Sequence, residues 1–262
     1  MNINPNRRGA LFSFGVAAAG LTLAASGAEA QAARSGAELA PAGAGQLKAL
    51  SARLAAAPRR RDFRTVPMIL DDPSLWDHEA IAVLTSYSGG PKQIWDNTEL
   101  NSPWLNGMRN AMNVQIWSFK HPDFLIVSAT HGSAQLPLLD QAMWDKYQLA
   151  KQAGAAYPTN TLLARNPTVE ADRNIQSQTG AYSGADNSIG GLMDRGVVFM
   201  ACHMALWELS AKLIKQGVNP DNLAHGAMVA EMTNHLAPGV VLTPGIVATI
   251  PAFQQAGYHY IK

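Results

Sequence analysis

The sequence has one cysteine, Cys202, among its 262 residues. An intramolecular disulfide is therefore impossible, and cysteine pairing gives no information about the redox compartment. Charge is also scarce, because 15% of the residues are charged and the formal net charge is +1. A nucleic-acid partner would need a strong basic excess or patch, so none is expected. The one basic run, at 59–61, follows a proline, and we expect a solvated segment before the folded domain.

Motifs of several enzyme classes are missing as well. His78-Glu79 is not followed by a second histidine at the spacing that a zinc protease needs. The haem-attachment motif Cys-x-x-Cys-His is absent. No Gly-x-Ser-x-Gly turn follows a predicted strand, which argues against a serine hydrolase. The sequence therefore predicts no cofactor.

Soft metal ligands do occur around the cysteine and keep a metal site open as an alternative. Cys202, His203 and Met204 are consecutive, and such ligands suit copper or haem iron. Met228 and Met232 stand four residues apart, which is more simply explained by packing in the core. We therefore predict no metal-ligating residues.

The N-terminus has the layout of a bacterial signal peptide over residues 1–30. Arg7-Arg8 precede an Ala/Gly-rich apolar run, and Ala28-Glu29-Ala30 is a small-x-small cleavage site. Paired arginines before a weakly apolar core favour the twin-arginine export route. We expect cleavage after Ala30 and a periplasmic mature protein with no stable membrane span.

The rest of the chain divides into two parts. Residues 31–61 are rich in Ala, Gly and Arg and predict a linker or an arm that packs on the surface. Strands and helices alternate over 62–262, which predicts an α/β domain with a mostly parallel sheet. The polar stretch at about 154–188 is long for a connection and predicts an insertion. Strands are expected at 66–70, 81–87, 124–129, 196–202, 240–242 and 257–261.

The apolar run from Gly196 to Cys202 predicts a central strand that is buried on both faces. Helical spacing follows from His203 to Gln216, and Gly217 is expected to end that helix. Cys202 would then lie at the carboxyl end of a strand, where ligands and catalytic groups collect in open α/β sheets.

Several segments together resemble the DsrE/DsrF-like family of sulfur-relay proteins. They are 105–110, the strand with its His-Gly ending at 124–132, the central strand at 196–202, and the C-terminal stretches 244–247 and 254–262. The resemblance covers about 64–262 and is interrupted by the polar insertion. It implies a Rossmann-like domain that assembles into homo-oligomers and carries sulfur as a persulfide on Cys202. Many relatives have Cys-Gly-Asn where this chain has Cys-His-Met at 202–204, so the thiol has a titratable neighbour here.

The candidate catalytic residues are Cys202, His131 and His203. A thiolate at the start of a helix is stabilised by the exposed amides, although many free cysteines are simply buried apolar residues. His131 ends another predicted strand and could bind a thiolate or an anionic substrate, or be held by the loop backbone. Two functions stay open: a sulfur carrier with a small-molecule or protein donor and acceptor, and a non-catalytic oligomer that binds a small ligand, a metal or a partner.

Overall fold

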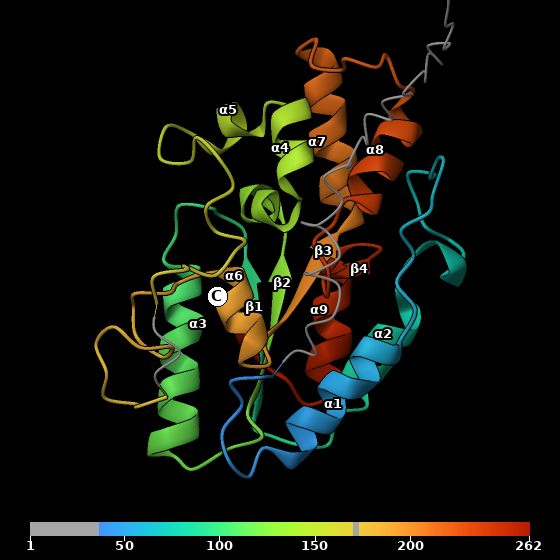
Figure 1. The fold of residues 1–262 in the computed structure, drawn as a ribbon. Helices are drawn as coiled ribbons and strands as arrows, with labels where there is room; N and C mark the ends of the chain where they lie inside the picture. Colours follow the sequence, from blue (N-terminus) through green and yellow to red (C-terminus); the bar gives the residue numbers. More distant parts are fainter. Residues whose placement is uncertain (1–36, 170–172) are drawn as a thin grey trace, which may run out of the picture. The chain divides into compact units, whose positions relative to one another are not determined.

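The computed structural model describes residues 37–169 and 173–262, which belong to one compact unit. A five-stranded sheet lies at its centre, and every neighbouring pair of its strands is parallel (Figure 1). Across the sheet the strand order is β4-β3-β2-β1-β5. The strands are β1 (Lys92–Asn97), β2 (Leu125–Thr130), β3 (Val198–Cys202), β4 (Val241–Thr243) and β5 (His259–Ile261).

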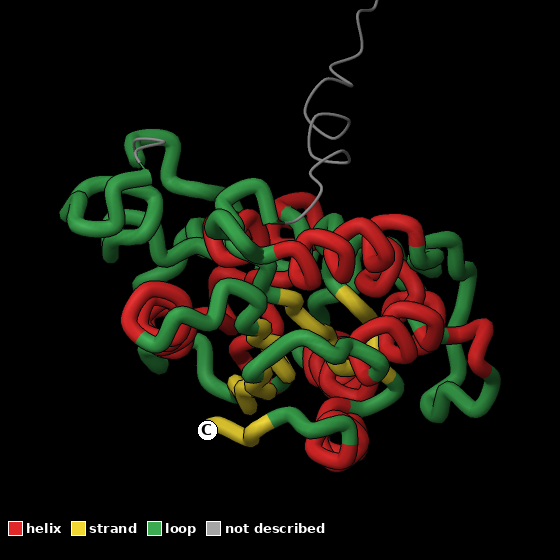
Figure 2. The backbone as a smooth tube through the Cα atoms, turned by 90° about the horizontal axis from the view of Figure 1, so that it is seen from below, coloured by secondary structure: helices red, strands yellow, loops and turns green. Residues whose placement is uncertain are grey.

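Helices lie on both sides of the strands (Figure 2). The chain steps in one direction from β1 to β4, and the connecting helices pack on one face of the sheet. Helix α9 then runs along the opposite face and returns the chain to β5, beside β1. The α-helices are α1 (Gly45–Ala56), α2 (His78–Thr85), α3 (Trp104–Asn113), α4 (Gln141–Lys146), α5 (Leu149–Ala153), α6 (Ile189–Asp194), α7 (His203–Lys215), α8 (His225–Asn234) and α9 (Ile246–Gln255). Two short 3₁₀ helices, η2 (Pro73–Leu75) and η4 (Gly132–Leu138), and a π-helical segment, η3 (Val114–Ser118), complete them.

Side-chain alternation along the strands divides the core into two layers. In β3, Phe199 and Ala201 face α3, α7 and α8, whereas Val198, Met200 and Cys202 face α1, α2 and α9. All five of these residues are less than a tenth exposed. A strand buried on both faces needs a continuous apolar run, and the run at 196–202 supplies it.

The structure confirms an α/β domain with a parallel sheet flanked by helices. The central strand and the helix after Cys202 form where the sequence predicts them. Two predicted strands are wrong. Residues 66–70 form an irregular loop with a bend, outside the sheet, and the run expected as a strand at 81–87 lies mostly in α2, where Ala80 and Leu84 are buried one helical turn apart. Short apolar runs have no clear period, so a buried helix can be mistaken for a strand.

The segment expected as a linker or surface arm contains α1, and it packs on the sheet. Leu47, Leu50 and Leu54 of α1 are buried in the same core layer as α2 and α9. The basic run at 59–61 is not freely solvated, contrary to expectation. Arg60 pairs with Glu79 and Arg61 with the buried Asp77, because the segment lies along α2 and β4.

The described part of the polar insertion has turns and no helix or strand. Its hydrogen bonds reach α3, through Arg109 and Asn113 to the Tyr182 carbonyl, and η4, through Asn160 to the Pro137 carbonyl. It therefore covers the outside of the helical layer. The predicted signal peptide at 1–30 lies outside the described residues.

Candidate functional site

Cys202 ends β3 and immediately precedes α7, at the carboxyl edge of the sheet. Its Sγ accepts a hydrogen bond from the main-chain N–H of Ile246 over 3.4 Å. Ile246 is the first residue of α9, so the thiol lies at the start of two helices, α7 and α9. Neither helix has a side-chain cap at its start among the described residues. Exposed amides at a helix start favour negative charge, so the surroundings of Sγ suit a thiolate.

The main chain of Cys202 is held on its other side by Gln135 of η4. The Cys202 N–H donates to Gln135 Oε1 over 2.6 Å, and Gln135 Nε2 donates to the Cys202 carbonyl over 3.1 Å. Gln135 is 2% exposed and Cys202 is 5% exposed, so both hydrogen bonds are shielded from water. The amide group therefore fixes the strand end that carries the thiol.

His131 directly follows β2 and lies at the same edge as Cys202. Its N–H donates to the Asn97 carbonyl over 3.0 Å, which extends the pairing of β1 and β2 by one residue. Thr130 pairs with Ala201 in the register of β2 and β3. His131 is thus level with Cys202 on the neighbouring strand, and adjacent strands lie about 4.8 Å apart.

The imidazole of His131 is turned toward β1, away from β3. Its Nε2 lies 2.8 Å from Asp96 Oδ1, and the Tyr260 hydroxyl donates to Asp96 Oδ2 over 2.7 Å. This second hydrogen bond is the main reason that the pKa of Tyr260 is raised. The His131 and Asp96 side chains are 20% and 12% exposed, so solvent reaches the cluster. With Nε2–H on the carboxylate, His131 leaves Nδ1 as a proton acceptor.

Sequence reasoning missed Asp96 and Tyr260. Asp96 lies in β1, whose sequence Lys-Gln-Ile-Trp-Asp-Asn lacks an apolar run. Tyr260 lies in the C-terminal strand, which the sequence predicts, but the sequence does not predict its neighbour β1. Once β1 is known, the shared carboxyl edge of parallel strands indicates the cluster.

His203, the first residue of α7, contacts neither Cys202 Sγ nor His131 through a hydrogen bond. Its Nε2 lies 3.0 Å from the Pro67 carbonyl and 3.1 Å from the Met68 carbonyl. Burial lowers the pKa of His203, so the ring is neutral near pH 7 and Nε2–H is the donor. The side chain thus fastens the loop at 67–68 to the start of α7.

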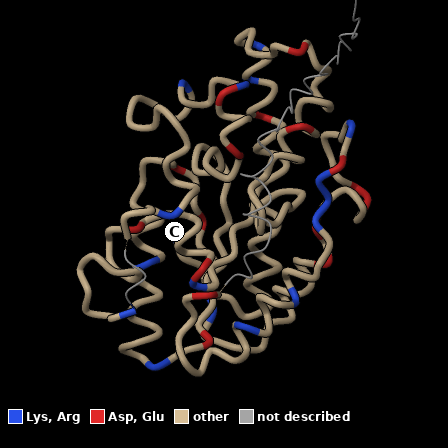
Figure 3. Tube along the Cα trace, in the orientation of Figure 1, with Lys and Arg blue, Asp and Glu red and all other residues tan. Residues whose placement is uncertain are grey.

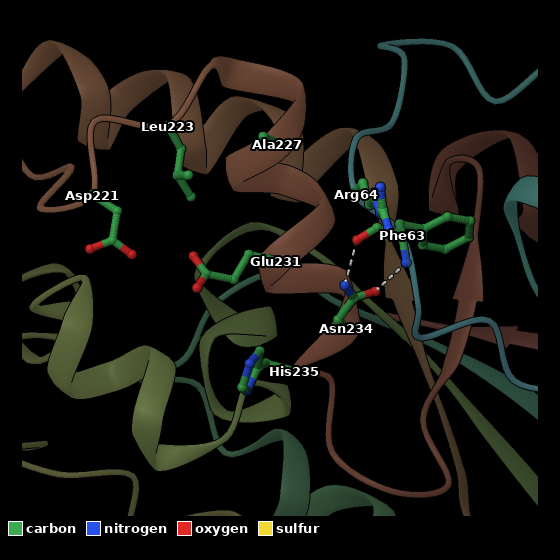
Figure 4. Close-up of a pocket in the computed structure, with 8 residues that line it drawn as sticks. All are labelled: Phe63, Arg64, Asp221, Leu223, Ala227, Glu231, Asn234 and His235. Carbon is green, nitrogen blue, oxygen red and sulfur yellow. Dashed lines mark hydrogen bonds between the residues drawn. The ribbon is translucent and has the colours of Figure 1, made fainter.

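A cavity of about 290 Å³ lies elsewhere, beside α8 (Figure 4). Glu231 and His235 of α8 line it together with Asp221, and the Asn234 side chain exchanges two hydrogen bonds with the main chain of Phe63. None of the three predicted site residues lines this cavity. The remaining lining residues are Arg64, Leu223 and Ala227.

The described part of the chain gives no sign of a metal centre or a membrane span. Within 37–169 and 173–262, no three His, Cys, Asp or Glu side chains lie close enough together to hold a metal ion. Among the described helices, none is long and apolar enough to span a bilayer. Basic and acidic residues are interspersed along the described trace (Figure 3).

Comparison of the chain with protein-family models, with curated proteins and with solved structures found no match.

Proposed function

We propose that the protein is a sulfur carrier that holds a persulfide on Cys202, as the resemblance to DsrE/DsrF-like proteins implies. One observation carries this proposal: the hydrogen bond from the Ile246 amide to Cys202 Sγ, at the start of two helices. A buried cysteine with a purely structural role needs no donor directed at its sulfur. A nucleophilic sulfur does, because the attacking species is the thiolate.

The reaction is a nucleophilic displacement with thiosulfate or a polysulfide as the small donor. The Cys202 thiolate attacks the outer sulfur of thiosulfate, an Sγ–S bond forms, and sulfite leaves with the electron pair of the broken S–S bond. The product is a persulfide anion, so charge balances and no external oxidant is needed. An acceptor thiolate would then take the outer sulfur by the same displacement.

Exposure favours a small donor over a protein donor. Cys202 is 5% exposed, so a bulky disulfide or a protein persulfide has little room to approach Sγ in line. Thiosulfate and short polysulfides have only a few heavy atoms. We therefore expect loading by these ions to precede delivery to an acceptor.

His131 is proposed to accept the thiol proton through water, because its ring lies at the same sheet edge but is turned toward β1. Asp96 fixes its tautomer, because the ionised carboxylate accepts Nε2–H and leaves Nδ1 free. Loss of a general base typically slows a reaction by about 10²-fold or more. His131→Ala should therefore slow persulfide formation by about this factor, and loading at the wild-type rate would contradict the role.

Intact mass spectrometry of the full chain, after incubation with thiosulfate and without reductant, tests the function. A reducible gain of one sulfur atom is expected for the wild-type protein and for Met204→Leu, a neighbouring control. Cys202→Ser should gain none. Absence of the adduct on folded wild-type protein, or an equal gain by Cys202→Ser, would contradict the proposal.

A second function is favoured by the cluster of His131, Asp96 and Tyr260. The cluster is partly exposed and contains no cysteine, so it could bind a small ligand without thiol chemistry. In that case Cys202→Ser would bind the ligand normally and His131→Ala would not. Isothermal titration with the two variants separates this function from sulfur transfer.

Export and assembly complete the proposal. We propose transport by the twin-arginine route with cleavage after Ala30, and a homo-oligomeric mature protein. Cell fractionation and light scattering test these two points. A protein retained in the cytoplasm would contradict export, and a monomeric mass would contradict assembly.

A further inference from the structure

Thr243 lies next to Cys202 on the neighbouring strand. The two residues are paired in the register of β3 and β4. Val241 belongs to the core layer that contains Cys202, whereas Leu242 belongs to the opposite layer. Because side chains alternate along a strand, Thr243 points to the same face as Cys202, beneath the start of α9.

The Thr243 hydroxyl is buried and has no partner. The residue is 0% exposed, and no hydrogen bond involves its Oγ1 within the described residues. Buried polar groups in folded proteins are almost always hydrogen-bonded, because an unpaired hydroxyl loses its water without compensation. The unpaired Thr243 hydroxyl beside the thiol therefore suggests that its hydrogen-bond partner is part of a bound ligand.

The missing partner is expected to be an acceptor with negative charge. Two residues after Thr243, Gly245 caps α9 without a side chain, and the Ile246 N–H already points at Sγ. The Ile246 N–H is a donor to the sulfur, and the Thr243 hydroxyl on the neighbouring strand is free to donate as well. Donors grouped at a helix start bind anions.

We propose that the Thr243 hydroxyl donates a hydrogen bond to the outer sulfur of the Cys202 persulfide. The inference rests on the proposed sulfur-carrier function and names the group that holds the transferred atom. After the Sγ–S bond has formed and sulfite has left, the negative charge lies on that outer sulfur. Thr243 then stabilises the product and has no partner before loading.

Thr243→Val removes the hydroxyl with little change in shape, and Thr243→Ser keeps it. Thr233→Val is the matched control, because Thr233 on α8 is also 0% exposed with an unpaired Oγ1 and lies in the opposite core layer. The two valine variants keep the side-chain volume, whereas Thr243→Ser keeps the hydroxyl and loses one methyl group. A general effect of removing a buried hydroxyl would appear in Thr233→Val as well.

The experiment loads each full-length variant with thiosulfate, removes the donor by gel filtration, and follows alkylation of the persulfide by iodoacetamide against pH. One hydrogen bond to a charged acceptor changes an equilibrium by about tenfold or more. For Thr243→Val the pH midpoint of alkylation should therefore rise by about one unit. Thr243→Ser and Thr233→Val should keep the wild-type midpoint.

Three outcomes would overturn the inference. If the wild-type protein loads normally and the pH midpoint of alkylation is unchanged in Thr243→Val, Thr243 has no such role, but the sulfur-carrier function is not contradicted. An equal shift in Thr233→Val shows a general packing effect. If wild-type Cys202 takes up no sulfur, the proposed function and the role of Thr243 fail together.

Discussion

The main-chain N–H of Ile246 donates to the sulfur of Cys202, although 44 positions separate the two residues in the chain. Their contact depends on the order of the sheet, because β3 and β4 are neighbours and α9 follows β4 directly. The thiol consequently lies at the start of two helices: α7, which follows β3, and α9, which follows β4. Local sequence around Cys202 indicates only the first of these helices.

Gln135 should be the main support of the strand end that carries the thiol. Gln135→Leu removes both hydrogen bonds to the Cys202 main chain and leaves the buried Cys202 N–H without its partner, whereas the carbonyl of this N-cap residue keeps the first hydrogen bond of α7. An unpaired buried N–H costs about 1–3 kcal/mol, so the free energy of unfolding should fall by about that amount. Urea denaturation followed by circular dichroism measures it.

The matched control for this change is Gln152→Leu. Gln152 makes an exposed hydrogen bond to the Gln216 side chain, so its loss should change stability by less than about 0.5 kcal/mol. Equal effects of the two substitutions would show that Gln135 does not hold Cys202.

Asp77 should stabilise the edge of the sheet at β4. Its carboxylate is 0% exposed and accepts from the Leu242 N–H over 2.7 Å, the Arg61 guanidinium over 2.9 Å and the Arg60 N–H over 3.1 Å. Removing one partner of a buried ion pair costs about 3–5 kcal/mol. Asp77→Ala should therefore destabilise the protein by about this amount in chemical denaturation.

Glu79 of α2 offers a control, because it also pairs with an arginine of the basic run at 59–61. It pairs with Arg60, but its side chain is 36% exposed, and ion pairs in water contribute little. Glu79→Gln should leave the denaturation midpoint nearly unchanged. If Glu79→Gln lowered the free energy of unfolding as much as Asp77→Ala does, the exposed Arg60–Glu79 ion pair would hold the basic segment as strongly as the buried Asp77 carboxylate.

The sequence predicts the thiol's place in the fold but not its whole environment. Val198 to Cys202 form an apolar run before an amphipathic helix, and such local patterns are visible without a structure. Thr243 and Ile246 come close to Cys202 only through strand order. Hydrogen bonds between neighbouring strands have no local signature.

The second half of the candidate site escapes prediction for a different reason. Lys92, Gln93 and Asp96 make β1 a strand of mixed polarity, because it lies near the edge, beside the short β5. Conversely, the apolar run of α2 resembles a strand, since its eight residues are too few to reveal a helical period. Because of these two errors, the predicted sheet lacks β1, the strand that brings Asp96 next to His131.

His203 should make stability depend on pH. Burial lowers its pKa in the folded protein below the ordinary 6.5, so the unfolded chain binds a proton more readily. Its contribution to folding is fully present above about pH 6.5 and is lost as the pH falls below that value. The wild-type protein should therefore be less stable in urea at pH 5 than at pH 8.

Other titrating groups also contribute to that pH dependence, so a variant isolates the histidine. In His203→Gln the amide can still donate to the carbonyls of Pro67 and Met68 but does not titrate. The difference in free energy of unfolding between the two proteins should narrow from pH 8 to pH 5. A constant difference would show that His203 does not bind its proton more weakly when folded.

Gly132 should be required for the position of His131. Its φ of +58° lies in the left-handed region, and a Cβ there would sit 2.5 Å from the Thr98 carbonyl oxygen. Gly132→Ala therefore combines backbone strain with a clash against a rigid main-chain atom, at a cost of about 2–4 kcal/mol.

Gly217→Ala separates these two effects. Gly217 has a φ of +75°, but no atom of the described residues lies within 4 Å of the position that an alanine Cβ would take, so only strain of about 1–2 kcal/mol is expected. Gly132→Ala should be more destabilising in urea, and it should also slow persulfide loading, because the clash displaces the adjacent imidazole from Asp96. Gly217→Ala should load at the wild-type rate. If both variants load normally, the exact placement of His131 is not needed, and the proton must leave Cys202 by another route.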